Sequence, residues 1–128
     1  MAFQYSVTVR NDKLDRIETT IGTAAVLKIF SGAEPANCAA ADPAGLLATL
    51  VLPSDWMSAA ASGSKAKLGT WSVVAIGAGT AASWRLYEST ATTCHIQGNV
   101  TDMTFDNTSI AIGQTITVNT FTLTAGNS

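Results

Sequence analysis

The clearest pattern in the chain is an alternation of apolar and polar side chains across residues 82–100. In the first half, Trp84 and Leu86 share one face, while Arg85 and Tyr87 share the other. In the second half, one face holds Cys94, Ile96 and Val100, and the other holds His95, Gln97 and Asn99. Two runs with a period of two, joined by a short polar connection, predict a β-hairpin with one buried face. We expect the apolar face to be the centre of the core and the polar face to be a contact surface.

Residues 9–21 have the periodicity of an amphipathic helix, with an apolar stripe at positions i, i+3 and i+7. The stripe consists of Leu14, Ile17 and Ile21. Thr8 or Asn11 is expected to cap the start of this helix, and Gly22 is placed to end it. Charged residues of both signs surround the stripe, and we expect them to form the solvated face. A stripe of this width can dock the helix on a sheet but cannot hold it alone.

Most of the remaining chain consists of short β-strand patterns separated by turn residues. They cover residues 25–31, 46–52, 65–76, 101–106 and 113–124. The 46–52 pattern is apolar on both faces, so this strand should lie centrally or beneath a covering element. The apolar positions change parity near Asn119 and Thr120, which predicts a β-bulge. Residues 32–45 read as a long loop, and residues 54–64 could contain one helical turn.

The number and spacing of these strands predict a mainly all-β fold: an antiparallel β-sandwich, jelly-roll-like, with one short N-terminal helix. We divide the chain into an N-terminal tail, residues 1–8, and a single β-sandwich domain, residues 9–128, which includes the helix. At 128 residues the chain is long enough to bury a core without a metal or a disulfide framework.

The composition narrows the classes of partner. The chain has 7 basic and 9 acidic residues, a net charge of −2 and 12% charged residues. Nucleic acids and anionic membranes bind clustered Lys and Arg, so neither is an expected partner. The start of the chain, MAFQYSVTVRND, lacks the basic and apolar segments of a signal peptide, and no stretch is apolar enough to span a membrane. We therefore expect synthesis in a cytoplasm.

The two cysteines, Cys38 and Cys94, leave two alternatives open. Synthesis in a cytoplasm favours reduced thiols. A bridge between the two would close a long loop and would stabilise the chain by about 4 kcal/mol in the chain-entropy model. A disulfide becomes the better interpretation if the protein ends up in an extracellular particle.

No motif for catalysis or for a cofactor stands out. His95 has no recognisable nucleophile or orienting acid, and one histidine with two separated cysteines lacks the spacing of a zinc site. Asp102 and Asp106 fall short of a calcium-loop pattern, and Gly77–Gly79 fits a turn better than a phosphate loop. We expect a protein that is not an enzyme and that holds no cofactor and no metal.

Four blocks span most of the chain: NDKLDRIETTIGTAAVLKIFSG, AEPANCAAADPAGLLATLVLPSDWMSAAASGSKAKLGTW, TCHIQGNVT and DMTFDNTSIAIGQTITVNTFTLTAGN. These blocks resemble a group of small proteins encoded by tailed bacteriophages and prophages. The resemblance implies a phage origin and a part in the virion, with a capsid decoration (cement) protein as the best fit. It carries over no catalytic residues.

The residues and the resemblance lead to the same expectation, a non-enzymatic structural protein on the capsid surface of a virion, made in the cytoplasm of a bacterial host. Its expected partners are the major capsid protein and further copies of itself, as dimers, trimers or neighbours on the shell. Contacts are expected from the N-terminal segment, the 32–45 loop and the polar face of the hairpin. The expected contact residues are Phe3, Tyr5, Arg10, Pro35, Asn37, Arg85, Tyr87, His95 and Gln97.

A receptor- or glycan-binding module of a phage tail fibre is the alternative. Such a module stacks ligands on exposed aromatic side chains, and Trp56, Trp71 and Tyr87 are the candidates. Trp84 shares a face with Leu86 and fits the core better. The copy number in the purified particle separates the two interpretations, because hundreds of copies indicate a shell protein and a handful indicate a tail part.

Overall fold

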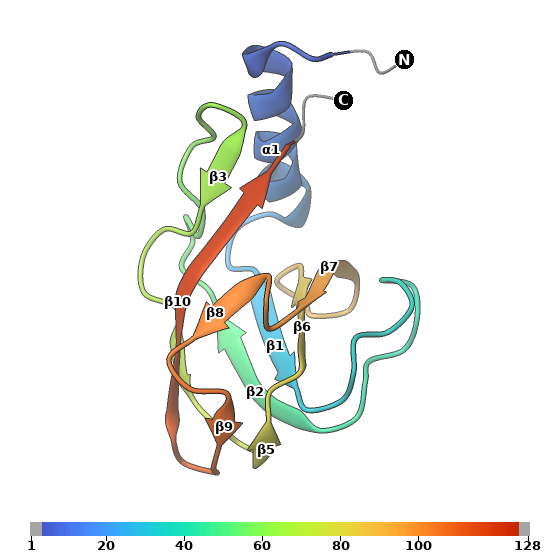
Figure 1. The fold of residues 1–128 in the computed structure, drawn as a ribbon, viewed down its shortest axis with the longest axis vertical. Helices are drawn as coiled ribbons and strands as arrows, with labels where there is room; N and C mark the ends of the chain where they lie inside the picture. The colour runs from blue at the N-terminus through green and yellow to red at the C-terminus, as the bar shows by residue number, and fades with distance from the viewer. Residues whose placement is uncertain (1–3, 126–128) are drawn as a thin grey trace.

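Residues 4–125 are described by the structure, a computed structural model (Figure 1). Within this range one helix, α1 (Val7–Ile21), precedes ten short strands. The strands are β1 (Val26–Phe30), β2 (Leu46–Val51), β3 (Ser64–Ala66), β4 (Ser72–Val74), β5 (Gly79–Thr80), β6 (Ser83–Tyr87), β7 (Cys94–Asn99), β8 (Met103–Phe105), β9 (Ser109–Ile110) and β10 (Thr115–Thr124). Their pairings are antiparallel. The prediction of a mainly all-β fold with one N-terminal helix is confirmed.

The first sheet has the strand order β2-β1-β6-β7. It contains the predicted hairpin as β6 and β7, and all five residues of β6 are buried. β2 lies at the edge of this sheet rather than at its centre. Part of that edge is covered, because the backbone amides of Ile76 and Gly77 donate to the Leu47 carbonyl at 2.8 and 3.1 Å. Leu47, Ala48 and Leu50 of β2 are buried, whereas Val51 at its end is 73% exposed.

The second sheet is built on β10, which pairs with β3, β4 and β8 along its length. Its pairing with β8 shifts register between Val118 and Thr120, which confirms the predicted bulge. The shift keeps Ile116, Val118 and Phe121 buried in the shared core. The two sheets face each other across this core, while the strand order does not confirm the finer prediction of a jelly roll.

A run of aromatic rings forms the centre of the core. The Trp84 and Phe121 rings meet edge to face at 5.2 Å, and the Trp71 ring lies 5.8 Å from Phe121 and 6.2 Å from Trp56. All three tryptophans are fully buried. Their burial overturns the interpretation of Trp56 and Trp71 as an exposed platform for sugars. The helical turn expected near Trp56 is also absent, because Met57 forms an extended bridge with Lys67 instead.

The helix begins earlier than the sequence pattern predicts. The Ser6 hydroxyl accepts a hydrogen bond from the Val9 amide at 3.2 Å, so Ser6 is the cap and neither Thr8 nor Asn11 is. The amide of Gly22 donates to the Glu18 carbonyl at 2.8 Å and ends the helix as expected. Within residues 4–125, no helix has the length and apolar character to cross a membrane.

Helix α1 projects beyond the sheets and is anchored on β3 (Figure 1). Lys65 of β3 is only 2% exposed, and its ammonium lies 2.8 Å from both the Asp15 and Glu18 carboxylates. The Asn11 amide oxygen also accepts from the Gly63 amide at 2.9 Å. The charged face of the helix is therefore only partly solvated, because Asp15 and Glu18 bind a buried lysine.

Candidate functional site

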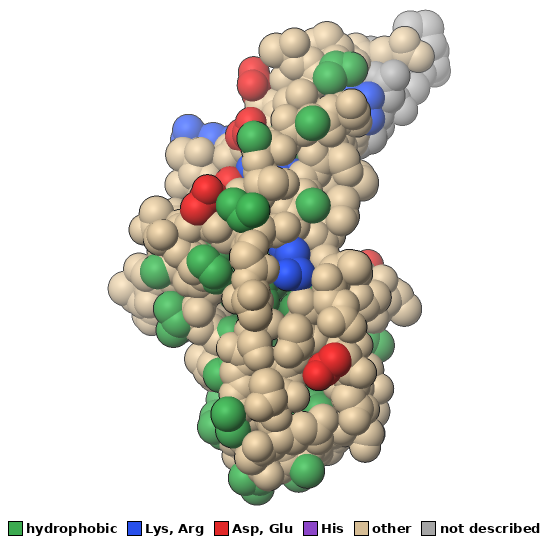
Figure 2. All heavy atoms as spheres, turned by 90° about the vertical axis from the view of Figure 1, so that its left-hand side faces the viewer, with side chains coloured by type: hydrophobic (Ala, Val, Ile, Leu, Met, Phe, Trp, Pro, Cys, Tyr) green, Lys and Arg blue, Asp and Glu red, His purple; other side chains and the backbone are tan. Residues whose placement is uncertain are grey.

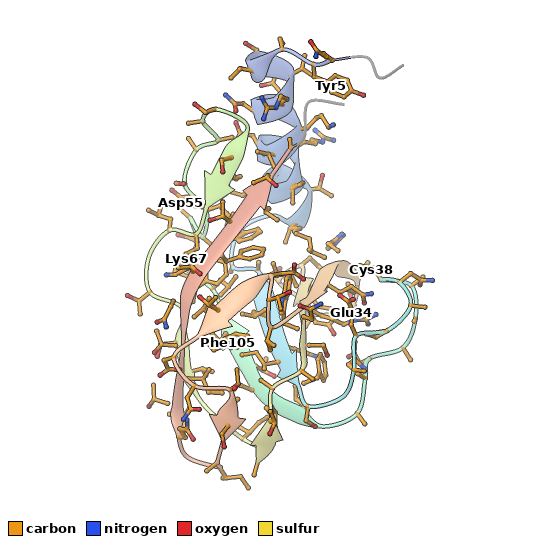
Figure 3. The ribbon with its side chains drawn as sticks, in the orientation of Figure 1. Tyr5, Glu34, Cys38, Asp55, Lys67 and Phe105 are labelled. Carbon is orange, nitrogen blue, oxygen red and sulfur yellow. The ribbon has the colours of Figure 1, made fainter. Side chains whose placement is uncertain are left out.

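The polar face of the β6–β7 hairpin is covered, not open to solvent. Residues 31–45, here called the covering loop, connect β1 to β2 and lie over this face; Figure 3 labels Glu34 and Cys38 on the loop. Arg85 and Tyr87 of β6 are each only 2% exposed. The expectation that these two side chains form a solvent-facing surface is wrong for the single chain.

Arg85 holds the covering loop to the sheet. Its Nη1 donates to Asp42 Oδ1 at 2.8 Å, and its Nη2 donates to the Asn37 carbonyl at 3.0 Å. Its Nε and Nη2 also donate to Gln97 Oε1 on β7, at 3.1 and 2.9 Å. Every nitrogen of the guanidinium thus has an acceptor from the chain itself, and these contacts use four of its five N–H donors.

Gln97 and Ser83 complete the attachment of the loop. The Gln97 amide donates to the Pro35 carbonyl at 2.7 Å, and the Ser83 hydroxyl donates to the Gly32 carbonyl at 2.7 Å. Five of the contact residues expected from the sequence and one further acid, Asp42, form a network that we call the loop clamp. Its members are Pro35, Asn37, Asp42, Arg85, Tyr87 and Gln97. The structure therefore brings five of the predicted contact residues together, and their hydrogen bonds are internal to the chain.

Asp42 is the electrostatic centre of the clamp. Burial opposes its ionisation, but hydrogen bonds from Tyr87 and Arg85 hold the pKa of Asp42 below its ordinary value. Burial and the Asp42 carboxylate raise the pKa of Tyr87 well above the usual range, and the phenol donates its hydrogen bond to Asp42. Lys28 adds a cationic group 4.9 Å from the centre of the Tyr87 ring. The clamp is stable with a charged Asp42 and a neutral Tyr87.

A β-bulge in the hairpin reverses the predicted orientation of Cys94. Leu86 pairs with Ile96, but Tyr87 pairs with Cys94, so His95 is an extra residue in β7. Cys94 therefore lies on the Tyr87 side, beneath the covering loop, and not in the core as the simple alternation predicts. Ile96 and Gln97 keep their predicted faces, because the register is regular beyond the bulge.

The two cysteines meet beside the clamp. Cys38, Asp42, Arg85, Tyr87 and Cys94 line an open hollow of about 370 Å³. Both thiols are free and half-buried, and the Cys94 thiol donates to the Ile96 carbonyl at 3.4 Å. Burial, with further contributions from the hydrogen bond and charge of Cys38, raises the pKa of Cys94 to about 12. The disulfide considered from the sequence is not formed here, but its partners are neighbours.

His95 lies apart from the clamp. Its Nε2 is 3.4 Å from Glu88 Oε2, and with Ile96 it faces Ile17 and Thr20 of α1 across a small hollow. Glu88 closes the β6–β7 turn by accepting hydrogen bonds from the backbone amides of residues 92 and 93, at 2.6 and 3.1 Å. These amides, together with neighbouring threonine hydroxyls, lower the pKa of Glu88 to about 2.

The predicted N-terminal contact residues also lie away from the clamp. Phe3 is outside the described residues. The Tyr5 ring lies 4.4 Å from the Lys13 ammonium, and Arg10 Nε donates to the Ala125 carbonyl at 2.9 Å. Tyr5 therefore lies beside the first turns of α1, and Arg10 of α1 contacts the residue that follows β10.

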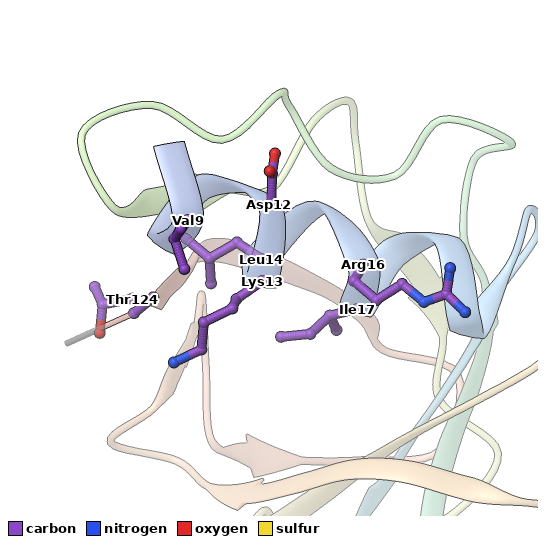
Figure 4. Close-up of a pocket in the computed structure, with 8 residues that line it drawn as sticks. Val9, Asp12, Lys13, Leu14, Arg16, Ile17 and Thr124 are labelled. Atoms are coloured by element: carbon purple, nitrogen blue, oxygen red, sulfur yellow. The ribbon is translucent and has the colours of Figure 1, made fainter. Parts of the chain in front are cut away.

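An open groove of about 800 Å³ runs between α1 and the end of β10 (Figure 4). Val9, Leu14 and Ile17 form its apolar floor, and Lys13 and Arg16 lie at its rim. Among residues 4–125, no three side chains of the kinds that bind metals come close enough to hold an ion. The groove is thus a shallow apolar surface without a metal-binding cluster in the described chain.

A second apolar surface lies at the opposite end of the molecule. Val74, Ile76 and Ile112 are 53%, 62% and 72% exposed, and Leu46 lies beside them at the start of β2. The backbone brings these segments together, since the Gly113 amide donates to the Ala75 carbonyl at 3.0 Å and the Ile76 amide donates to Leu47. Figure 2 shows hydrophobic side chains at this end, among others spread over the same face. We call these four residues the end patch.

Sequence reasoning missed Asp42 and Glu88. Each is an isolated acid, one in a loop of small residues and one at the end of a strand, and neither belongs to a motif. One signal for Asp42 was available: Arg85 is a lone arginine in a strand expected to be buried, and a buried arginine needs a carboxylate nearby.

Comparison of the chain with models of protein families, with curated proteins and with solved structures gives no match.

Proposed function

We propose that this protein is a structural part of a tailed-phage virion, a decoration protein that binds the outer surface of the major capsid protein. The observation that supports the proposal best is the end patch. Exposed aliphatic side chains on neighbouring segments at one end of a small domain are typical of a protein–protein contact. The resemblance to phage-encoded proteins supplies the partner.

The satisfied polar groups of the molecule are also consistent with a binding role. The clamp satisfies its own donors and acceptors, and across residues 4–125 no buried side-chain nitrogen or oxygen lacks a partner. A domain of this kind presents a preformed surface, so binding costs little ordering of the chain. Binding through tryptophan platforms, as in a tail-fibre module, has lost its support because the three rings are buried.

Two measurements test the proposal. The first is the copy number of the chain in purified particles of the phage that encodes it, determined by quantitative mass spectrometry. A decoration protein is present in hundreds of copies per particle, whereas a tail part is present in a handful. A handful of copies, or none, contradicts the proposal.

The second measurement tests the end patch directly. Binding of the purified chain to shells of the major capsid protein is compared with that of the double variant Ile76→Asp, Ile112→Asp. We expect the variant to keep its circular dichroism spectrum and to bind at least about tenfold more weakly, because two charges are placed in an apolar contact. Val7→Asp is the matched control, since Val7 is 51% exposed at the start of α1, where an acid is favourable. Equal binding by all three proteins contradicts the assignment of the patch.

A further inference from the structure

Two thiols from distant parts of the chain face the same hollow. Cys38 is on the covering loop, Cys94 is the first residue of β7, and their side chains are in hydrogen-bonding contact. We propose that Cys38 and Cys94 are a disulfide modification site, at which a small-molecule disulfide oxidises the pair and locks the covering loop to the hairpin. This inference is independent of the proposed function.

Both thiols are held in place by the structure around them. Next to Cys38, the Asn37 carbonyl accepts from Arg85 at 3.0 Å, and the Asn37 side chain accepts from the Ala40 amide at 3.0 Å. Cys94 is fixed in the ladder opposite Tyr87. Groups that are already positioned pay little entropy to react, so an intramolecular bridge is favoured over a link between two chains.

The hollow admits a small reagent. Its other walls are small side chains, among them Ala39, Ala40, Ala41 and Ala91, and the hollow is open to solvent. Neither cysteine is fully buried. A glutathione-sized disulfide can therefore reach the sulfurs without opening the core.

We place the first attack on Cys38, because burial raises the pKa of Cys94 to about 12 and keeps the Cys94 thiol protonated. The Cys38 thiolate attacks one sulfur of the small disulfide, whose S–S bond breaks and releases one thiolate that takes up a proton. Cys94 then gives up its proton, attacks the Cys38 sulfur of the mixed disulfide and expels the second thiolate. The protein loses two hydrogen atoms and the reagent is reduced to two thiols.

The test uses the folded full-length chain incubated with oxidised glutathione, then alkylated and analysed by intact mass and by peptide mapping without reduction. We expect a monomer lighter by the mass of two hydrogen atoms and a peptide pair linked through Cys38 and Cys94. Oxidation should raise the thermal unfolding midpoint, and a reductant should reverse the increase. The variant Cys94→Ser should instead keep a stable glutathione adduct on Cys38, while Cys38→Ser should react more slowly.

Several results would overturn the proposal. One is a wild-type chain that keeps glutathione adducts or forms only linked dimers. Another is a wild-type chain whose thiols stay free, whether or not Cys94→Ser is modified. The capsid-binding test is separate from this one, because the variants of the end patch leave both cysteines in place.

Discussion

The guanidinium of Arg85 lies 2.8 Å from the carboxylate of Asp42, which is 43 residues earlier in the chain. This pair joins the middle of the first sheet to a loop that contains no helix or strand. A buried guanidinium is stable only with acceptors around it, and the loop supplies two of them, Asp42 and the Asn37 carbonyl. Hydrogen bonds to the first sheet therefore hold the covering loop in place, although none of its residues is itself buried.

Removal of the Asp42 carboxylate should loosen the covering loop. In Asp42→Ala, Arg85 loses its charged partner while it stays buried, and we expect a cost of about 1–3 kcal/mol in the free energy of unfolding. Urea unfolding measures this cost, and hydrogen exchange should show faster exchange in residues 31–45. Glu34→Ala is the control, because Glu34 is an exposed acid in the same loop, and its effect should stay within about 0.5 kcal/mol. Equal effects of the two variants would show that Asp42 does not hold the loop.

The phenol of Tyr87 should ionise only at unusually high pH. The chain has two tyrosines, so Tyr5→Phe leaves Tyr87 as the one phenol to follow by its near-ultraviolet absorbance. Burial and Asp42 raise the pKa of Tyr87 above the ordinary 10.0. The neutral phenol therefore stabilises the folded chain. This contribution is complete below pH 10.0, and it is lost as the pH rises through the raised pKa of Tyr87 in the folded chain. Half-ionisation at the ordinary pKa in the folded chain would contradict the burial of Tyr87 in the clamp.

Glu88 should keep its charge in acid. The amides of the turn lower its pKa from 4.5 to about 2, so its contribution to stability is present above pH 4.5 and is lost as the pH falls toward 2. Carbon-detected NMR titration of the Glu88 carboxyl measures this value directly. Glu88→Gln should remove this part of the acid dependence and leave the neutral-pH fold intact. An unshifted Glu88 titration would mean that the turn does not hold the carboxylate.

Lys65 should be a major anchor of helix α1. Burial opposes its charge, but hydrogen bonds to Asp15 and Glu18 hold the pKa of Lys65 above its ordinary value of 10.5. Its contribution is therefore complete below pH 10.5 and is lost as the pH rises through the folded value. We expect Lys65→Ala to cost about 2–3 kcal/mol in unfolding free energy, from a cavity and two broken ion pairs.

Lys67→Ala is the matched control for this prediction. Lys67 lies two residues further along and donates at 2.8 Å to the Gly69 carbonyl, so its removal should cost less than about 1 kcal/mol. Urea midpoints and the helical circular dichroism signal distinguish the two variants. Similar midpoints would show that Lys65 is not a major anchor of the helix.

Local patterns predicted the main elements of the secondary structure, although the helix cap and the helical turn expected near Trp56 were wrong. Alternation identified β6 and β7, the stripe of Leu14 and Ile21 identified the helix, and a change of parity identified the bulge in β10. These features depend on neighbours within a few residues, so they can be read along the chain. The bulge at His95 escaped the same reasoning because both Cys94 and His95 are plausible on either face.

The candidate site depends on contacts between distant residues, which a single sequence does not display. A polar face in an alternating hairpin is usually solvated, and nothing in the pattern of Arg85 and Gln97 shows that a loop will cover it. The loop's own composition, rich in alanine with one key acid at Asp42, gave no sign of its role. The pairing of the thiols was considered from the sequence, but their position next to the clamp required the fold.

The bulge in β7 also determines how the hairpin responds to a change in chain length. His95 is the one residue of β7 that has no partner in β6, while Cys94 and Ile96 on either side pair with Tyr87 and Leu86. A chain that lacked His95 would place Cys94 and Ile96 in a regular ladder with the same partners. Position 95 is thus a point where a single-residue deletion leaves both the core and the sulfur contact in register, whereas a deletion at any paired position of β7 shifts the strand.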